Sequence, residues 1–285
     1  MIGLDPIHVE RVVKNALAED IGSGDITTAL TVPAIARVEA VIVSRAAGVL
    51  AGIEVARAAF QATDPRILFE ALLEDGAEIE PGTTIALVQG GAASILTAER
   101  VALNFLQRLS GVATLTAKYV AAVAHTQAKI VDTRKTTPGL RVLEKYAVAV
   151  GGGRNHRFGL YDGILIKDNH IAAVGGITAA VAAARAHAPH TLRIEVEVGS
   201  LQEMEEAIEA GADAVLLDNM PVDMLKKAVE VAQGKVILEA SGRVSLDNVA
   251  AIAETGVDLI SVGALTHSAQ ALDISLEVGG NHAGP

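Results

Sequence analysis

The sequence contains no cysteine and no tryptophan, and aromatic residues make up only 2% of its 285 residues. The absence of cysteine excludes disulfide bonds, thiolate catalysis and cysteine-based zinc sites. Basic residues are also in the minority: 23 Lys and Arg stand against 34 Asp and Glu, a formal net charge of −11. Because nucleic-acid-binding proteins rely on basic surfaces and stacking aromatics, we expect no nucleic acid partner.

Long uncharged apolar runs are missing as well, although hydrophobic residues make up 51% of the chain. No stretch reaches the roughly 18 residues that a membrane-spanning helix needs. The N-terminus, MIGLDPIHVERVVKNALAED, lacks the basic start and apolar core of a signal peptide. We therefore expect a cytoplasmic protein of one or two domains, each large enough to bury a core.

From about residue 128 onward one pattern repeats. Short runs rich in β-branched residues alternate with Ala/Leu-rich stretches of helical period, which is typical of βα units in a parallel sheet. Six units fall short of the eight of a closed barrel, so the pattern predicts an incomplete or open α/β barrel. The predicted strands are AKIVD (128–132), GILIK (163–167), RIEVEV (193–198), AVLLD (214–218), KVILE (235–239) and LISVG (259–263).

The first half of the chain lacks this repeat. Its runs of β-branched residues are separated by Gly/Pro turns, as in TTALTVPAIARVEAVIVSRAAGVLAG and EIEPGTTIALVQG, and predict sheet strands. Residues 95–125 have apolar positions at three- and four-residue spacing, which predicts one or two helices joining two domains.

Each predicted barrel strand is followed by polar residues: DTRK, KDNH, EVEV, LDN, EASG and SVGA. In α/β barrels the active site forms at the C-terminal ends of the strands. A surface loop that starts after a strand could account for one polar ending, but it does not account well for six in succession. We therefore expect these endings to converge on one site.

The stretch 132–170 is cationic in an acidic chain, with seven Lys and Arg against four Asp and Glu. Arg141 and Lys145 lie four apart on a predicted helix, and we interpret them as solvated surface. Three glycines precede Arg154, Asn155, His156 and Arg157, and let the backbone turn sharply so that His156 and Arg157 can face the barrel mouth. We assign Arg154 to solvent. Arg134, Lys135, Arg157 and Lys167 follow strand ends or this loop, and a site holding both Arg and Lys suits a ligand with several anionic groups.

Two further groups complete the pattern. Glu197 and Asp218 end successive strands, where they could hold Mg²⁺ or sugar hydroxyls, or alternatively cap the following helices. Ser241-Gly242 and Val262-Gly263-Ala264 lie between the last strands and their helices, the usual place for a phosphate in barrels. The ligand that fits is a polyanion with a terminal phosphate, and phosphoribosyl pyrophosphate with an acidic acceptor matches this description.

At this point the residues match a known family. The segment DTRKTTPGLRVLEKYAVAVGGGRNHRFGLYDGILIKDNHI (132–171) closely resembles the core of quinolinate phosphoribosyltransferases, also called nicotinate-nucleotide pyrophosphorylases (carboxylating). ALAEDIGSGDITT, ILTAERVALNFLQRLSG, IEVEV, LLDN, EASG and SVGALTHSAQALDISLE extend the resemblance over nearly the whole chain.

The resemblance implies an N-terminal α/β sandwich domain (1–112, joined by 268–285) and an open, about seven-stranded α/β barrel (113–267). It implies a homodimer with shared sites. It also implies the transfer of phosphoribosyl from phosphoribosyl pyrophosphate to quinolinate, with Mg²⁺ as cofactor, giving nicotinate mononucleotide, pyrophosphate and CO₂ for NAD biosynthesis.

Site roles also follow from the resemblance. Glu197 and Asp218 would hold the ribose hydroxyls and the metal, and, with Lys135 and Lys167, would be the catalytic residues. Arg243 stands where the family usually has a second glycine, which puts the glycine-specific part of that loop in doubt. The substrate-binding residues would be Arg100 (from the partner subunit), Thr133, Arg134, Lys135, His156, Arg157, Lys167, Glu197, Asp218, Ser241, Gly242, Arg243, Val262, Gly263 and Ala264.

Three alternatives stay open. A paralogue of the same fold could accept another aromatic acid. Lys167, at a strand end, could form a Schiff base as in a barrel aldolase. A non-catalytic binding barrel is a third reading, but it leaves the pairing of Glu197 with Asp218 unexplained.

Overall fold

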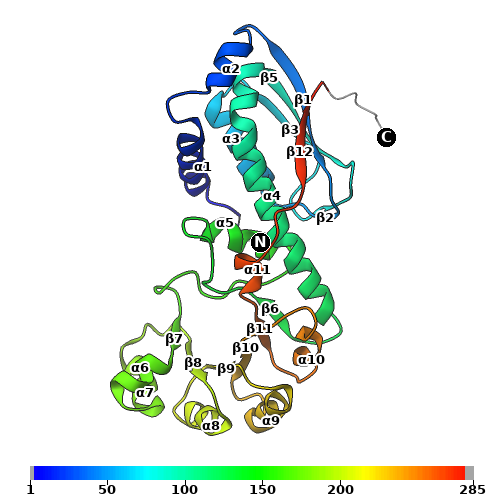
Figure 1. Ribbon diagram of the computed structural model, residues 1–285. Coiled ribbons are helices and arrows are strands. Elements are labelled where there is room, and N and C mark those ends of the chain that lie inside the picture. Colours follow the sequence, from blue (N-terminus) through cyan, green and yellow to red (C-terminus); the bar gives the residue numbers. More distant parts are fainter. Residues whose placement is uncertain (1–2, 280–285) are drawn as a thin grey trace. The chain divides into compact units, whose positions relative to one another are not determined.

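The computed structural model describes residues 3–279, which form two compact units (Figure 1). The first unit takes its residues from Met1–Leu115, Thr137–Gly152 and Ala269–Pro285, and the second from Thr116–Thr136 and Gly153–Ser268. The resemblance implied a single barrel segment, 113–267. The contacts instead group Thr137–Gly152 with the first unit.

The first unit is built on an antiparallel sheet in the order β12-β1-β5-β3. Its strands are β1 (Arg37–Ser44), β3 (Leu68–Ala71), β5 (Thr84–Gly91) and β12 (Ile274–Val278). The last strand of the described residues, β12, pairs with β1, so this late segment completes the N-terminal sheet. The other elements before residue 124 are α1 (Pro6–Ile21), α2 (Ile26–Thr31), α3 (Ile53–Thr63), α4 (Ala92–Val123) and the short pair β2 (Gly48–Val49) and β4 (Glu78–Ile79).

The predicted helical region 95–125 is one helix, α4, which crosses the boundary between the units after Leu115. Within the first unit this helix packs very closely on the chain leading to β12. A Cβ atom on Gly111 would lie 2.0 Å from the carbonyl oxygen of Gln270. Glycine is therefore the residue that this contact requires. Across the described residues, no helix is both long and apolar enough to cross a membrane.

The second unit contains a parallel sheet of six strands in the order β6-β11-β10-β9-β8-β7. All six predicted strands are present, which confirms the α/β interpretation. They are β6 (Lys129–Val131), β7 (Ile164–Ile166), β8 (Ile194–Val198), β9 (Ala214–Asp218), β10 (Ile237–Ser241) and β11 (Leu259–Ser261). The helices that follow β7 to β11 are α6 (Asp168–Val174), α7 (Ile177–His187), α8 (Leu201–Glu209), α9 (Val222–Ala232), α10 (Val249–Ala253) and α11 (Ala264–His267).

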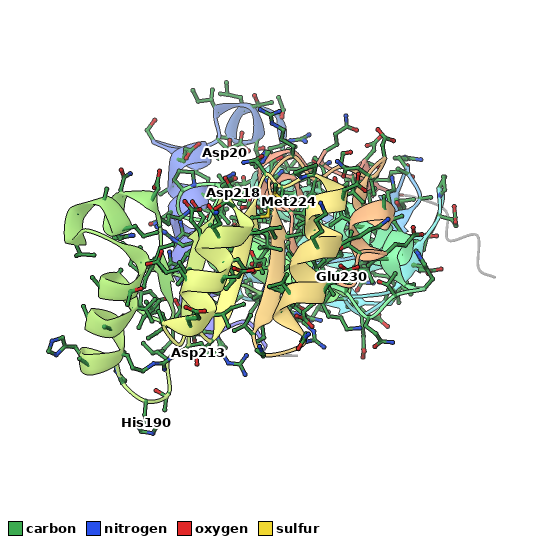
Figure 2. All side chains as sticks on the ribbon, turned by 90° about the horizontal axis from the view of Figure 1, so that it is seen from below. Asp20, His190, Asp213, Asp218, Met224 and Glu230 are labelled. Atoms are coloured by element: carbon green, nitrogen blue, oxygen red, sulfur yellow. The ribbon has the colours of Figure 1, made fainter. Side chains whose placement is uncertain are left out.

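The barrel is open between β6 and β7, the two outer strands of the sheet. Arg154 makes a parallel bridge with Val131: its N–H donates to the Ile130 carbonyl at 2.8 Å, and its own carbonyl accepts from the Asp132 N–H at 3.1 Å. A seventh strand is thus reduced to a bridge of one residue. Figure 2 shows Asp218 at the carboxyl end of β9 and Asp213 towards the opposite end of the unit.

Helix α5 (Arg141–Val150) corrects one sequence prediction. Lys145 is fully buried and Arg141 is half-buried, so the interpretation of this pair as solvated surface is wrong. The adjacent Glu144 is also fully buried, and its carboxylate accepts hydrogen bonds from Arg108 at 2.7 Å and from the Thr137 hydroxyl at 2.7 Å. The buried carboxylate of Glu144 is thus satisfied inside the first unit, which a helical periodicity count cannot reveal.

We predict that Gly111→Ala lowers the free energy of unfolding by about 1–3 kcal/mol, because the new methyl group must displace backbone rather than a flexible side chain. Gly91→Ala is the matched control, since its Cβ atom would meet only Ser94 Oγ at 3.6 Å. Urea denaturation of the two variants checks this. Equal shifts of the two midpoints would contradict the close approach at Gly111.

Candidate active site

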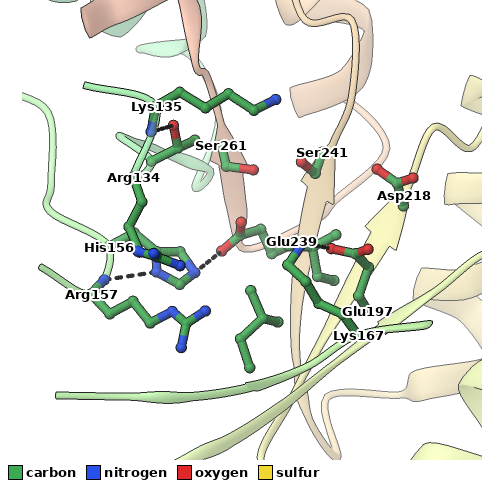
Figure 3. A pocket seen from close by; sticks show the side chains of 13 residues that line it. Arg134, Lys135, His156, Arg157, Lys167, Glu197, Asp218, Glu239, Ser241 and Ser261 are labelled. Atoms are coloured by element: carbon green, nitrogen blue, oxygen red, sulfur yellow. Dashed lines mark hydrogen bonds and ion pairs between the residues drawn. The ribbon is translucent and has the colours of Figure 1, made fainter. Parts of the chain in front are cut away.

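A pocket of about 400 Å³ lies at the C-terminal ends of the parallel strands of the second unit (Figure 3). Most of the predicted site residues in this unit line it. Four further lining residues, Leu165, Leu216, Glu239 and Ser261, were not predicted. The predicted residues in the lining are Thr133, Arg134, Lys135, His156, Arg157, Lys167, Glu197, Asp218 and Ser241.

The pleat of the strands explains why these residues, and not their neighbours in sequence, line the pocket. On each of three strands the lining residues are two apart, so that both side chains point to the same face: Leu165 with Lys167, Leu216 with Asp218, and Glu239 with Ser241. Parallel pairing then aligns them across the sheet. Glu239 pairs with Leu216 and Leu216 with Glu197, and one step further along Ser241 pairs with Asp218.

The pocket has walls of opposite charge. Arg134, His156 and Arg157 lie on one side of Glu239 in Figure 3, and Glu197 and Asp218 on the other. Burial and then the neighbouring Arg134 lower the pKa of the Arg157 guanidinium. Two guanidinium groups that repel one another in this way favour an anion between them.

Lys167 and Glu197 form an ion pair in which the Lys167 ammonium donates to the carboxylate. This pair ties the end of β7 to the end of β8. An ammonium group bound to a carboxylate is not the neutral amine that a Schiff base requires. The arrangement therefore disfavours the aldolase reading.

Lys135 is fixed through its backbone. Its N–H donates to Thr133 Oγ1 at 3.0 Å, and its carbonyl accepts from the hydroxyl of the fully buried Thr266 at 2.7 Å. Its side chain lies over the loop after β11, where a Cβ atom on Gly263 would lie 3.1 Å from Lys135 Cδ. A lysine in this position can reach a ligand held by that loop.

The glycine loop is pinned by a buried aspartate. Asp132 is fully buried, and its carboxylate accepts from the His156 N–H at 2.9 Å and from the Asn155 side chain at 2.7 Å. Gly152 has a φ of 86°, which favours glycine. The loop brings His156 and Arg157 to the pocket and leaves Arg154 exposed, as the sequence predicted.

The hydrogen bonds of His156 define its tautomer. Its Nδ1 accepts from the Arg157 N–H at 2.7 Å, so the proton is assigned to Nε2. Nε2 lies 3.0 Å from Glu195 Oε2 and 3.5 Å from Glu239 Oε2. The ring is thereby shared between the loop backbone and two carboxylates, of which Glu239 lines the pocket.

His156, Glu195 and Glu239 are also close enough together to be considered as a metal site, since their candidate ligand atoms lie within 4.8 Å of one another. The tautomer argues against it. A metal on Nε2 requires the ring proton on Nδ1, where the Arg157 N–H already points. This cluster is therefore suited to holding protons rather than a metal ion.

The remaining predicted residues of this unit lie outside the pocket lining: Gly242, Arg243, Val262 and Gly263 are in the loops after β10 and β11, and Ala264 begins α11. Gly242 has a φ of 98°, and a Cβ atom there would lie 2.3 Å from Asn219 Oδ1. Arg243 is exposed and has a φ of 51°, a left-handed conformation that glycine adopts more readily. Arg100 lies on α4 in the first unit and is exposed.

Comparison with known proteins agrees with this geometry. The model of the quinolinate phosphoribosyl transferase C-terminal domain matches residues 112–277, and that of the N-terminal domain matches residues 25–110. The chain belongs to the quinolinate phosphoribosyltransferase family.

Individual relatives cover almost the full length. The chain is 48% identical to the nicotinate-nucleotide pyrophosphorylase [carboxylating] of Mycobacterium leprae, over 93% of this chain and 95% of that protein. It is 44% identical to a probable nicotinate-nucleotide pyrophosphorylase [carboxylating] of Bacillus subtilis, over 96% of this chain and 95% of that protein. The solved structure of NadC from Streptococcus pyogenes superimposes with a TM-score of 0.94 at 43% identity, covering 97% of this chain and 98% of that chain.

Two acidic residues that contact His156, namely Glu195 and Glu239, were not predicted from the sequence. Glu195 precedes Glu197 by two residues on β8, and Glu239 precedes Ser241 by two on β10, so each shares a face with a residue that was predicted. The strand period of two could therefore have identified both. What it could not supply is their proximity, which depends on His156 reaching in from the glycine loop.

Burial and then the charge of Glu195 raise the pKa of Glu239 from an ordinary value of 4.5 to about 7. The folded protein then keeps this proton while the unfolded chain loses it, so the folded state loses stability as the pH rises from about 4.5 to 7.

We predict that Glu239→Gln removes this loss. Its free energy of unfolding should exceed that of the wild type by about 2–3 kcal/mol at pH 8, and the difference should shrink towards pH 5. Urea denaturation at several pH values measures it, with the exposed Glu205→Gln as control. A difference that is the same at pH 5 and pH 8 would contradict the raised pKa.

Proposed function

We propose that this protein joins the phosphoribosyl group of phosphoribosyl pyrophosphate to quinolinate and releases pyrophosphate and CO₂, forming nicotinate mononucleotide for NAD biosynthesis. The observation that carries the proposal is the pocket itself, with cationic side chains along one wall and paired carboxylates along the other. Family membership over nearly the whole chain supports the same reaction.

The cationic wall would bind the acceptor. Arg134 and Arg157 offer planar guanidinium groups that match the two carboxylates of quinolinate. Lys167 lies across the pocket from them, beside Glu197. Neutralising these carboxylates lets the ring nitrogen approach an anionic donor. Binding here thus orients the acceptor and lowers the electrostatic barrier to the encounter.

The reaction balances without an additional acid or base in its first step. The ring nitrogen forms a bond to C1 of the ribose, while the bond from C1 to pyrophosphate breaks and pyrophosphate leaves with the electron pair. The ring nitrogen is now cationic. It stabilises the electron pair left on the adjacent carbon when the 2-carboxylate departs as CO₂, and a proton then replaces the carboxylate.

Glu197 and Asp218 would hold the ribose hydroxyls and Mg²⁺. Their carboxylate oxygens are hard donors that suit Mg²⁺ with waters in between, and both face the pocket. Bound Mg²⁺ would neutralise charge on the departing pyrophosphate. One Glu197 oxygen already accepts from Lys167, and Asp218 Oδ2 accepts from the Asn219 side chain at 2.8 Å, so both carboxylates are oriented in advance.

The loops after β10 and β11 would bind the 5′-phosphate through backbone N–H groups, with Gly242 and Gly263 allowing the close approach. Lys135, which overlies the second loop, would add a charge. The side chain of Arg243 is exposed, and in this proposal its backbone rather than its guanidinium contributes. A different aromatic acid as acceptor is the second candidate, and acceptor competition distinguishes the two.

Shared sites in a cytoplasmic homodimer complete the proposal, with Arg100 acting on the acceptor bound by the partner. The first unit exposes large apolar side chains, among them Ile26, Leu30 and Ile35, at 71%, 80% and 92%. Leu96, also exposed, precedes Arg100 by one turn of α4. Apolar surface of this kind is typical of an interface between subunits.

We predict that the purified protein with Mg²⁺ and phosphoribosyl pyrophosphate converts quinolinate at least tenfold more efficiently than nicotinate. An acceptor that lacks the 2-carboxylate leaves pocket cations unpaired. Release of CO₂ and formation of nucleotide measure the reaction. Comparable kcat/KM values for the two acids would refute the assignment of the acceptor.

In the same assay, Arg134→Ala and Lys167→Ala should each lower kcat/KM by roughly 10²–10³, since each removes a charge aimed at the reacting groups. Lys226→Ala, on the outer surface of α9, is the matched control and should retain full activity. A loss confined to the control, or equal in all three variants, would remove the pocket from the mechanism.

The dimer proposal predicts complementation. Arg100→Ala and Lys167→Ala proteins should each be nearly inactive, yet a refolded mixture should recover about a quarter of wild-type activity. Half of the randomly formed dimers are hybrids, and each hybrid has one site with both residues intact. If Arg100 served its own barrel, hybrid dimers verified by mass would stay inactive.

A further inference from the structure

Glu239 is the least satisfied polar side chain in the pocket. It is 1% exposed, and neither of its carboxylate oxygens has a hydrogen-bond partner within the described range 3–279. His156 Nε2 lies 3.5 Å away and points its single N–H at Glu195, 3.0 Å away. The Ser261 hydroxyl in the same pocket acts to lower the pKa of Glu239, but it makes no hydrogen bond to either oxygen in the structure. A buried carboxylate without a donor strongly disfavours its charged form.

The neighbours of Glu239 reinforce this preference. On the strands that flank β10 it pairs with two uncharged residues, Leu216 of β9 and Leu259 of β11. The titratable groups that face it are Glu195 on β8, which disfavours its charge, and His156, which acts in the opposite direction. Burial, the larger effect, and then Glu195 raise the pKa of Glu239 to about 7.

Glu239 differs in this respect from the other carboxylate that lies in the same row of the sheet. Glu197 accepts from the ammonium of Lys167, so its ionised form is supported. Glu239 lines the same pocket without such a partner. Of these two carboxyl groups, Glu239 is therefore the one whose protonation responds more to a new charge nearby.

We propose that Glu239 takes up a proton when quinolinate binds, so that binding of the acceptor is linked to pH through this one buried carboxyl group. The inference rests on the proposed function, because quinolinate brings two carboxylates into the pocket that Glu239 lines. Two negative charges beside a carboxyl without a donor favour its neutral form. By linkage, quinolinate must then bind more weakly wherever Glu239 is ionised beforehand.

Titration calorimetry with quinolinate alone tests this directly, because no reaction occurs without the donor. Measurements in buffers of low and high ionisation enthalpy give the number of protons taken up per quinolinate. For the wild type this number should rise from near zero at pH 6 to more than about half a proton at pH 8. In Glu239→Gln the rise should be absent, and in the exposed control Glu205→Gln it should match the wild type.

Glu195→Gln provides a second test, since removing its charge lowers the pKa of Glu239. Proton uptake in this variant should begin at lower pH than in the wild type. Steady-state kinetics gives an independent readout: above pH 7, kcat/KM for quinolinate should fall more steeply in the wild type, by up to about tenfold per pH unit, than in Glu239→Gln.

Equal proton uptake in the wild type and Glu239→Gln, or parallel pH profiles of their kcat/KM, would overturn the inference. The proposed function would still stand in that case, provided that the wild type turns over quinolinate. An enzyme that binds phosphoribosyl pyrophosphate and does not turn over quinolinate at any pH would instead remove the proposed function. The two failures are therefore distinct.

Discussion

The register of the parallel strands in the second unit is the constraint on which the site depends. Parallel strands end at the same edge, and their period of two sends alternate side chains to one face. Pairing of Ser241 with Asp218, and of Leu216 with Glu197, therefore places side chains from distant parts of the chain side by side. A shift of one residue in β9 would turn Asp218 away from the pocket and replace it with a leucine.

Two of the ionisable groups in this pocket already have partners before any ligand enters. Lys167 is paired with Glu197, and His156 is shared between Glu195 and the backbone of Arg157. Arg134 and Arg157 stand close enough for their repulsion to be felt in the pKa of Arg157. The pocket thus holds oriented charges in a partly desolvated space, which costs folding free energy and spares the reaction the cost of reorganising its surroundings.

Much of this could be read from the sequence, because strands and strand endings are local features. The six barrel strands and the convergence of Arg134, Lys167 and Asp218 follow from period and position. Features that depend on tertiary contacts could not be predicted from the sequence. Lys145 looked like surface because helical spacing does not show what covers a helix, and its burial appears only in the folded unit. Glu239 was passed over because its strand neighbours are apolar and its relation to His156 is set by a loop more than 80 residues earlier.

The central claim is that the cationic wall of the pocket receives the acceptor carboxylates while the opposite carboxylates face the ribose. A crystal structure of the protein with bound quinolinate tests it most directly. The account predicts one quinolinate in the pocket, with carboxylate oxygens within about 3.2 Å of the Arg134 and Arg157 side chains and the ring nitrogen directed towards Glu197 and Asp218. Quinolinate bound outside this pocket, or with its carboxylates directed away from both arginines, would contradict the account.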